Sequence, residues 1–436
     1  MASAEARAFS GVTSRSAAVQ RVQQNSHTIR SPRRLTSGKF AISRSFTPPS
    51  LPIMDKIRLG IIGFGGMGQA HAKNLLDGKI PRCELVAACD AVEANLKKFP
   101  QLRGFATPDQ LFAANCVDAV LIATPHFAHT TLGIAALNAG LHVLVEKPIS
   151  VHRADAERLI AAHKNKKQVF AAMFNQRTDP YYQAIRRMVQ GGELGQVRRV
   201  QWTITNWFRT QAYYGMGGWR ATWAGEGGGV LLNQCPHNLD LFQWIFGMPQ
   251  RVTGFCAWGR YHDIEVDDDV TAYFEYADGK TATFITSTGE APGTNRLEIA
   301  AENGRLVYED DKITWTRNAI PMGEFSKTSP EAFGRPATEI VNVPADGHGE
   351  QHIGILKNFT AAILDGATLL SPAEEGIHSV ELANSILLSA WNGSRAVALP
   401  IDGAVYEREL QKKIATSKPK EKPAVAAVAD LSKSVV

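Results

Sequence analysis

The chain of 436 residues is 44% hydrophobic and 20% charged, the composition of a globular protein long enough for two domains with separate cores. It contains no run approaching the ~20 apolar residues that a membrane-spanning helix needs, which excludes a membrane partner. The net charge of +5 divides into +7 for residues 1–53, +4 for residues 411–436 and −6 for residues 54–410, so the body of the chain offers no basic stripe for a nucleic acid.

Residues 1–53 are rich in Ser and Arg and contain one acidic residue, Glu5. Such a segment cannot build a packed core, and we expect it to be disordered. It has the composition of an organellar transit peptide, which would make the protein organellar. Alternatively it results from an upstream translation start, with the true start at Met54, directly before the first predicted strand. The second interpretation is preferred and predicts a cytoplasmic protein.

The cysteines are odd in number and show no C-x-x-C spacing. They indicate reduced thiols in a cytosol-like compartment. Because no cysteine pair has the spacing of zinc ligands, we expect neither a zinc site nor another metal. The residues are Cys83, Cys89, Cys116, Cys235 and Cys256.

Strand and helix patterns alternate from residue 57 to about residue 174. Strands are predicted at 57–62, 84–89, 117–123, 141–146 and 168–173, and helices at 66–77, 108–114, 127–139 and 151–166. Alternation of this kind with continuously apolar strands is typical of a parallel sheet covered on both faces. The sequence therefore predicts an α/β, doubly wound domain over residues 54–176.

A glycine-rich turn follows the first strand. Gly63 allows a tight turn, Gly65 lets the backbone approach a pyrophosphate, and Gly68 lets the next helix pack on the strand. Asp90 ends the second strand, where its carboxylate can accept the 2′-hydroxyl of an adenosine ribose and repel a 2′-phosphate. The pattern predicts NAD, in preference to NADP. The predicted cofactor contacts are Gly63, Phe64, Gly65, Gly66, Met67, Gly68 and Asp90.

Two further segments follow strands of the same sheet, at the edge where ligands of open α/β sheets bind. One runs from Thr124 to His129, and the other contains Glu146 and Lys147. His126 is interpreted as a capping or solvated residue. Thr124, Pro125, His129, Glu146 and Lys147 complete the predicted cofactor site.

The pattern changes after Phe174. A helix at 180–190 is followed by long alternating strands at 196–208, 250–261, 266–276, 280–288, 295–300 and 305–308. Further helices are predicted at about 229–246, 350–365 and 373–394. These elements predict an α+β domain over residues 177–410 with a large, mostly antiparallel open sheet. Residues 411–436 are predicted to be a disordered tail.

A glycine run from Gly227 to Gly229 opens the helix predicted at 229–246. Asn233 and His237 are four residues apart, so they are predicted to share one face of that helix. Asp240, one turn further on, is interpreted either as orienting the imidazole of His237 or as a structural residue.

In these motifs and their order, the chain resembles the Gfo/Idh/MocA oxidoreductases (glucose–fructose oxidoreductase, inositol dehydrogenase and relatives) over about residues 56–410. The matching motifs are the glycine turn, Thr124-Pro125, Glu146-Lys147-Pro148 and the glycine run that leads to His237. The resemblance implies a Rossmann domain and a second domain whose open sheet forms subunit contacts, hence a homodimer or homotetramer.

The resemblance also implies oxidation or reduction of a secondary hydroxyl or keto group of a sugar, cyclitol or glycoside, with hydride transfer to or from NAD(P). It implies that Lys147 binds substrate and cofactor and that His237 transfers the proton. The chain departs from the family at Asn233, where Asp is usual. An amide can bind substrate hydroxyls, but it cannot stabilise an imidazolium by charge.

Physical chemistry agrees with these roles, since a neutral His suits proton transfer and a Lys ammonium stabilises developing alkoxide charge. Aromatic and polar residues that precede the glycine run are typical of sugar-binding surfaces, or else of a Trp-rich core. The predicted substrate contacts are Asn175, Arg177, Trp219, Arg220 and Asn233. The alternative function is a cofactor-binding sensor of the same fold without turnover, which the presence of both Lys147 and His237 disfavours.

Overall fold

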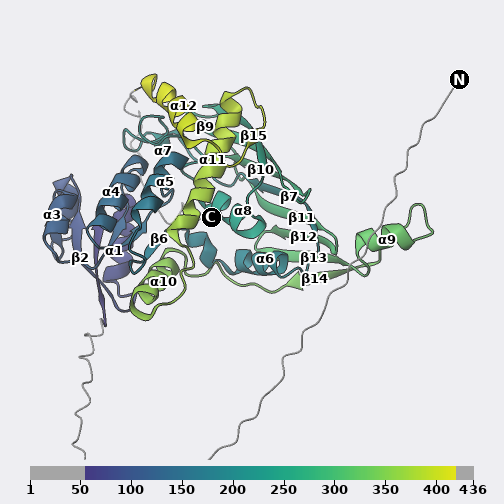
Figure 1. Ribbon diagram of the computed structural model, residues 1–436, viewed down its shortest axis with the longest axis horizontal. Helices are drawn as coiled ribbons and strands as arrows, with labels where there is room; N and C mark the ends of the chain where they lie inside the picture. Colours follow the sequence, from purple (N-terminus) through teal and green to yellow (C-terminus); the bar gives the residue numbers. More distant parts are fainter. Residues whose placement is uncertain (1–54, 419–436) are drawn as a thin grey trace, which may run out of the picture. The chain divides into compact units, whose positions relative to one another are not determined.

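The computed structural model describes residues 55–418. The predictions for residues 1–53, and those for residues 419–436 of the predicted tail, lie outside the described residues. The N-terminal half contains a parallel sheet in the order β3-β2-β1-β4-β5-β6 (Figure 1). Its strands are β1 (Ile57–Ile62), β2 (Cys83–Cys89), β3 (Arg103–Phe105), β4 (Ala119–Ile122), β5 (His142–Val145) and β6 (Phe170–Ala172).

The strand order reverses between β1 and β4, which places a crevice at the carboxyl ends of these two strands. Four helices between the strands lie where the sequence predicts them: α1 (Gly66–Leu76), α3 (Pro108–Ala113), α4 (His126–Asn138) and α5 (Arg153–Ala162). The sequence did not predict β3 or the four-residue helix α2 (Glu93–Leu96), because elements this short carry little periodic signal.

The second sheet has the order β14-β13-β12-β11-β7-β10-β9-β8-β15. All neighbouring strands are antiparallel except β7 and β10, which are parallel. The predicted fold class is therefore confirmed. The strands are β7 (Val197–Ile204), β8 (Arg251–Trp258), β9 (Asp267–Glu275), β10 (Thr281–Ser287), β11 (Asn295–Ala301), β12 (Gly304–Glu309), β13 (Lys312–Asn318), β14 (Thr338–Val343) and β15 (Val397–Ala398).

One face of this sheet is covered by α6 (Pro180–Gln190), α8 (Pro236–Phe246) and α11 (Gly376–Trp391) (Figure 1). Trp202 of β7 is completely buried there, and its ring stacks on Phe242 of α8 at 6.2 Å between centroids. The described residues form one compact unit, although the two sheets have separate hydrophobic cores. The predicted boundary between residues 176 and 177 stays a prediction.

The helix predicted over 229–246 begins only at Pro236. The backbone amides of Gly229 and Leu231 instead donate to the buried carboxylate of Asp267, at 2.7 and 2.9 Å. A Cβ on Gly229 would lie 1.9 Å from the carbonyl oxygen of Asp267, so glycine alone fits this approach. The prediction that Asn233 shares a helical face with His237 is therefore wrong.

The C-terminal part of the chain holds elements that the sequence did not predict, β13, α9 (Met322–Thr328), β14 and α12 (Gly403–Ala415). Helix α12 begins at a cap in which Asp402 accepts the amides of Ala404 and Val405. It packs through buried Tyr406 and Leu410. The predicted disordered tail is thus wrong for residues 411–415, which belong to this helix. Helix α10 (Gln351–Asp365) lies where it was predicted.

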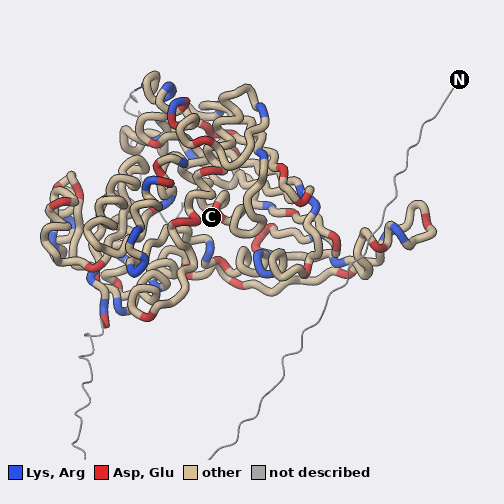
Figure 2. Tube along the Cα trace, in the orientation of Figure 1, with Lys and Arg blue, Asp and Glu red and all other residues tan. Residues whose placement is uncertain are grey.

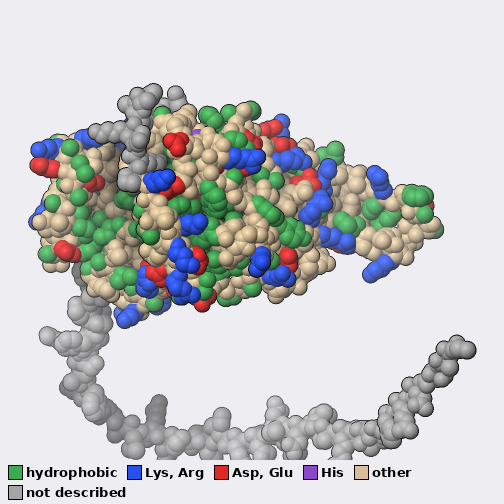
Figure 3. Space-filling view, turned by 90° about the horizontal axis from the view of Figure 1, so that it is seen from above, with side chains coloured by type: hydrophobic (Ala, Val, Ile, Leu, Met, Phe, Trp, Pro, Cys, Tyr) green, Lys and Arg blue, Asp and Glu red, His purple; other side chains and the backbone are tan. Residues whose placement is uncertain are grey.

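Lys and Arg are interspersed with Asp and Glu along the described trace (Figure 2). Hydrophobic side chains lie among the charged ones on the face drawn in Figure 3. Phe255 of β8 and Ile340 of β14 are 54% and 72% exposed, and both lie on strands of the open sheet. Within residues 55–418, no helix is both long and apolar enough to cross a bilayer.

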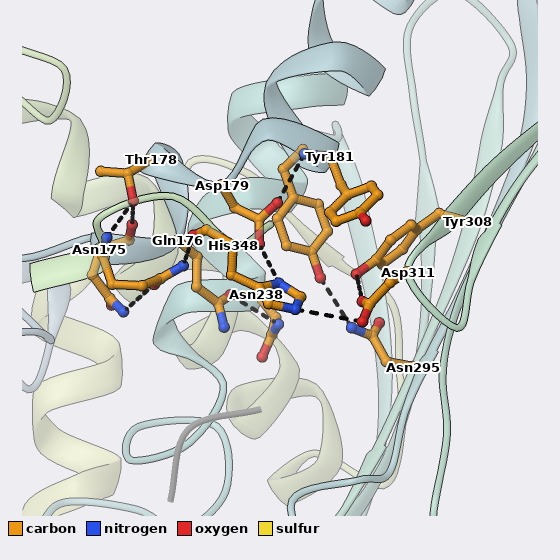
Figure 4. Close-up of polar contacts among 12 residues, drawn as sticks. Asn175, Gln176, Thr178, Asp179, Tyr181, Asn238, Asn295, Tyr308, Asp311 and His348 are labelled. Atoms are coloured by element: carbon orange, nitrogen blue, oxygen red, sulfur yellow. Dashed lines mark hydrogen bonds and ion pairs between the residues drawn. The ribbon is translucent and has the colours of Figure 1, made fainter. Parts of the chain in front are cut away.

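His348, in the segment between β14 and α10, connects that segment to other parts of the second half. His348 lies between two carboxylates, with Nδ1 3.1 Å from Asp179 and Nε2 3.4 Å from Asp311 (Figure 4). Partial burial opposes the charged form, but the two carboxylates raise the pKa of His348 above its usual value. The charged form of His348 therefore bridges the N-cap of α6 and the turn between β12 and β13.

We predict that His348→Gln lowers the melting temperature at pH 5.5 but not at pH 9. A raised folded-state pKa contributes stability that is fully present below the unfolded-state pKa and is lost as pH rises through the folded-state pKa. Because the His348 side chain is half exposed, solvent screens the pairs, and the difference should be only roughly 1–2 °C. Thermal unfolding of both proteins at several pH values measures it, and an equal loss at both pH values would contradict the charged bridge.

Candidate active site

The glycine turn has the geometry that a dinucleotide needs. Gly63 has φ +88°, and a Cβ there would lie 2.7 Å from backbone atoms of Ala123. A Cβ on Gly68 would lie 2.1 Å from the carbonyl oxygen of Gly63, whereas one on Gly65 would meet nothing within 4 Å. Close packing therefore restricts Gly63 and Gly68 to glycine. Gly65 instead leaves open space beside the backbone, where a pyrophosphate can approach. Helix α1 starts at Gly66 after an N-cap glycine, so no capping side chain competes with a phosphate for its N-terminal amides.

Asp90, at the end of β2, holds the turn in place. Its Oδ2 accepts the backbone amide of Phe64 at 2.6 Å, and its Oδ1 accepts that of Val92 at 2.7 Å. The carboxylate therefore lies beside the glycine turn, where the ribose of a dinucleotide is expected. Thr124, which follows β4, has a buried hydroxyl with no hydrogen-bond partner among the described residues. These residues fit a bound dinucleotide.

The two histidines at the start of α4 are both buried. The ring of His129 ties two segments together, since Nδ1 lies 2.7 Å from the Pro148 carbonyl and Nε2 lies 2.8 Å from the Thr124 carbonyl. Neither nitrogen is left for the predicted cofactor contact, so His129 positions the backbone around the site. The interpretation of His126 as capping or solvated is wrong, because its Nδ1 faces the carbonyl of Glu226 at 3.3 Å.

Glu146 connects the Lys147 segment to α1. Its Oε1 lies 2.6 Å from Nε2 of buried His71, and its Oε2 accepts the backbone amide of Lys147 at 3.2 Å. Burial alone would raise the pKa of Glu146, but the hydrogen bond and charge of His71 lower it to about 2. This carboxylate is ionised and orients its neighbour, so its part in the cofactor site is indirect.

Lys147 joins the first sheet to the turn before α8. Its Nζ donates to the backbone carbonyl of Asn233 at 2.6 Å. The Asn233 side chain in turn donates through Nδ2 to Glu226 and accepts from the hydroxyl of Tyr213 at 3.3 Å. Burial lowers the pKa of Lys147, although the charges of Glu146 and Glu226 oppose this. Asn233 therefore occupies the centre of a partly buried polar network.

His237, in the first turn of α8, is 8% exposed, and its Nδ1 has no partner among the described residues. Burial, followed by the charge of Lys147, lowers the pKa of His237 well below its usual value. The imidazole is therefore neutral at pH 7 and can accept a proton. Asp240 does not orient it, because that carboxylate pairs with Arg177 at 2.6 and 2.7 Å.

The predicted role of Arg177 in binding substrate is wrong for the same reason. The residue is completely buried, and a second carboxylate, that of Glu375, lies 2.5 Å from its Nη1. Asn175, two residues earlier, does leave a polar atom free: its Nδ2 donates to Gln351 at 2.7 Å, while its Oδ1 is buried without a partner among the described residues. The Asn175 segment is drawn in Figure 4.

The aromatic region before the glycine run divides into core and surface. Trp202, Trp207 and Trp223 are at most 6% exposed and belong to the core of the second half. Trp219 is partly exposed, and its ring lies 5.6 Å from that of His126 and 4.7 Å from the guanidinium of Arg220. Trp219 and Arg220 thus lie where the two halves of the chain meet.

Sequence reasoning missed His71, Glu226 and Arg209. All three lie near the polar network around Lys147. His71 contacts Glu146, and the charges of Glu226 and Arg209 act on the pKa of Lys147. The position of Glu226 directly before the glycine run was a signal that could have found it. Nothing in the local pattern marks His71 or Arg209.

Two family models match this chain. The oxidoreductase family with an NAD-binding Rossmann fold matches residues 57–174, and the GFO/IDH/MocA C-terminal domain matches residues 182–307. The chain belongs to the Gfo/Idh/MocA oxidoreductase family. It is therefore an enzyme with an NAD-binding domain, and the alternative of a sensor without turnover is disfavoured.

Relatives of known name agree with this membership. Inositol 2-dehydrogenase of Rhizobium meliloti is 26% identical over 343 residues, which are 76% of this chain and 96% of the relative. Myo-inositol 2-dehydrogenase of Thermotoga maritima is 30% identical over 274 residues, 59% of this chain and 77% of the relative. Among solved structures, the WlbA dehydrogenase from Chromobacterium violaceum in complex with NADH and UDP-GlcNAcA has a TM-score of 0.69 and 27% identity, covering 82% of this chain and 99% of that chain.

We predict that Gly65→Val and Gly68→Val separate cofactor binding from folding. Both should weaken NAD binding by roughly tenfold or more. Only Gly68→Val should lower the melting temperature clearly, because its side chain meets the backbone of Gly63, whereas the side chain at position 65 enters open space. Calorimetric titration with NAD and thermal unfolding measure the two effects. Wild-type NAD affinity in Gly65→Val would place the pyrophosphate elsewhere.

Proposed function

We propose that this protein interconverts a secondary hydroxyl and a keto group on a sugar, cyclitol or glycoside, with NAD as the preferred cofactor. The observation that carries the proposal is that the charge of Lys147, a partly buried lysine after β5, acts on His237, a buried neutral histidine whose ring lies 6.5 Å from that of Phe174 after β6. The names of the inositol dehydrogenases among the relatives support a polyhydroxylated substrate.

Lys147 and His237 would have different roles in the reaction of the hydroxyl group. Bound nicotinamide supplies the hydride acceptor or donor. In the oxidative direction, the neutral imidazole of His237 accepts the hydroxyl proton. The ammonium of Lys147, fixed by its bond to the Asn233 carbonyl, orients the hydroxyl oxygen and stabilises the negative charge that develops on it. Low exposure strengthens both interactions, because water does not screen them.

The surrounding residues would bind the other hydroxyl groups. Asn175 offers an unpartnered buried oxygen, and Asn233 borders the lysine. Trp219 presents a partly exposed aromatic ring next to Arg220, a combination that suits the C–H face and the hydroxyls of a sugar. The homodimer or homotetramer and the cytoplasmic location stay predictions.

We expect His237→Ala to reduce turnover by about 10²–10⁴-fold with little change in NAD affinity, because it removes only the proton acceptor. Lys147→Ala should reduce both turnover and substrate affinity. In the wild-type enzyme the rate of oxidation should fall as pH decreases through the pKa of His237, and that fall should lie on the acidic side of pH 6.5. Steady-state rates from pH 4.5 to 9 test this. A His237→Ala enzyme with near-normal turnover would falsify the assignment.

We also expect catalytic efficiency with NAD to exceed that with NADP by about tenfold or more, because the carboxylate of Asp90 would repel a 2′-phosphate. Asp90→Asn should narrow the ratio, since the amide keeps a hydrogen-bonding oxygen near Phe64 but lacks the charge. Kinetics of both proteins with both cofactors measure the ratio. Equal efficiencies in the wild-type enzyme would show that Asp90 does not select the cofactor.

A further inference from the structure

Two arginines near the proposed site form no ion pair with any carboxylate of the described residues. Arg209 follows β7, and Arg220 lies in the segment that leads to the glycine run. Among the described residues, neither makes an ion pair with a carboxylate, although other arginines of the second half do, such as Arg296 with Glu309. The Nη1 of Arg209 donates to the carbonyl of Phe208 at 2.9 Å, and its Nε is buried with no hydrogen-bond partner in the described part of the chain.

Both guanidinium groups surround one tyrosine. The carbon centres of Arg209 and Arg220 lie 5.2 and 4.9 Å from the centroid of the Tyr213 ring, and Nη1 of Arg220 donates to the Tyr213 hydroxyl at 3.0 Å. That hydroxyl also donates to the side chain of Asn233, whose backbone carbonyl accepts from Lys147. The arginines are therefore linked to the reactive lysine through two intervening residues.

The charges of Arg209 and Arg220 also act on Lys147. After the larger effect of burial, the charges of Arg220 and Arg209 lower the pKa of Lys147. The carboxylate of Glu226 is influenced by Lys147 and Arg220; burial raises the pKa of Glu226, and the charge of Arg220 lowers it. Glu226 already accepts the backbone amide of Ala221 at 2.6 Å and the amide of Asn233.

The positive charges of the network are thus only partly compensated. The carboxylate of Glu146 lies on the other side of Lys147 and is held by His71. One shared carboxylate, that of Glu226, is left to face Lys147 and Arg220. Partly buried cations without a counter-charge are costly, and an arriving anion would remove that cost.

We propose that the substrate carries an anionic group, a carboxylate or a phosphate, that Arg209 and Arg220 bind while Lys147 and His237 act on a hydroxyl of the same molecule. This inference rests on the proposed function, because it assigns the substrate class of that site. Guanidinium groups recognise such oxyanions through paired, charge-assisted hydrogen bonds. A neutral sugar would leave the two guanidinium groups without a counter-charge.

The experiment compares matched neutral and anionic sugars on the NAD-saturated enzyme. Glucose, glucuronate and glucose 6-phosphate form one such set, and the galactose and N-acetylglucosamine series form others. Turnover is followed by nicotinamide absorbance, and affinity is measured by calorimetry. In at least one set, we expect an anionic sugar to bind about 10- to 100-fold more tightly than its neutral counterpart, with a kcat/KM higher by the same factor. This preference for the anionic sugar should weaken as the salt concentration increases. The carboxylate and phosphate arms identify the oxyanion.

Variants locate the effect. Arg209→Gln and Arg220→Gln should each reduce the preference for the anionic sugar by about tenfold while NAD affinity stays unchanged, and Arg209→Lys should restore part of it. Arg186→Gln is the matched control, because that guanidinium also stacks on a tryptophan, Trp244 at 4.4 Å, but lies on α6. The control should keep the preference of the wild type.

The outcomes separate this inference from the proposed function. Turnover of neutral sugars that equals or exceeds turnover of their anionic counterparts would overturn the anion site and leave the redox function intact. Anion-selective binding that the arginine variants abolish, without turnover of any sugar, would establish the site and overturn the redox function. If a variant fails to fold, the comparison of anionic and neutral sugars on the wild-type enzyme still tests the inference. A wild-type enzyme that shows no preference for the anionic sugar at any salt concentration would contradict it.

Discussion

The hydrogen bond from Lys147 to the backbone carbonyl of Asn233 is the constraint on which the site depends. It joins the end of β5 in the first sheet to the turn before α8 in the second half. A backbone acceptor fixes the ammonium without neutralising it, so the charge remains available to a developing alkoxide. The position of the turn depends in its own right on Asp267, whose carboxylate accepts the amides of Gly229 and Leu231.

Burial acts in the same direction on both reactive groups. It lowers the pKa of Lys147 and the pKa of His237, because the charged form of each is desolvated. The charge of Lys147 adds to the effect on His237, so the histidine is held neutral. Asp at position 233 would bring a second carboxylate against Glu226, whereas the amide donates to it. The departure from the family pattern is therefore consistent with a neighbouring buried acid.

The helices that carry the site are held by a separate group of ion pairs around the buried Arg177. Arg177 and Asp240 connect the segment after β6 to α8, and Glu375 extends the pair toward α11. Breaking such a pair leaves an uncompensated buried charge, which is strongly destabilising. These residues thus keep His237 in place without contacting the reacting atoms.

The sequence by itself determined the features that depend on local backbone geometry. The glycine turn, helix α1, the strands before Asp90 and Lys147, and the family were all predictable, because the positive φ of Gly63 and the close approach at Gly68 restrict those positions to glycine. Only the tertiary structure decided which polar side chains face one another. Arg177 was predicted to contact substrate and is in a buried ion pair, the ring nitrogens of His129 face two backbone carbonyls, and Glu226 lies against Asn233. Such contacts join residues far apart in the chain, and no local pattern specifies the direction in which a long polar side chain points.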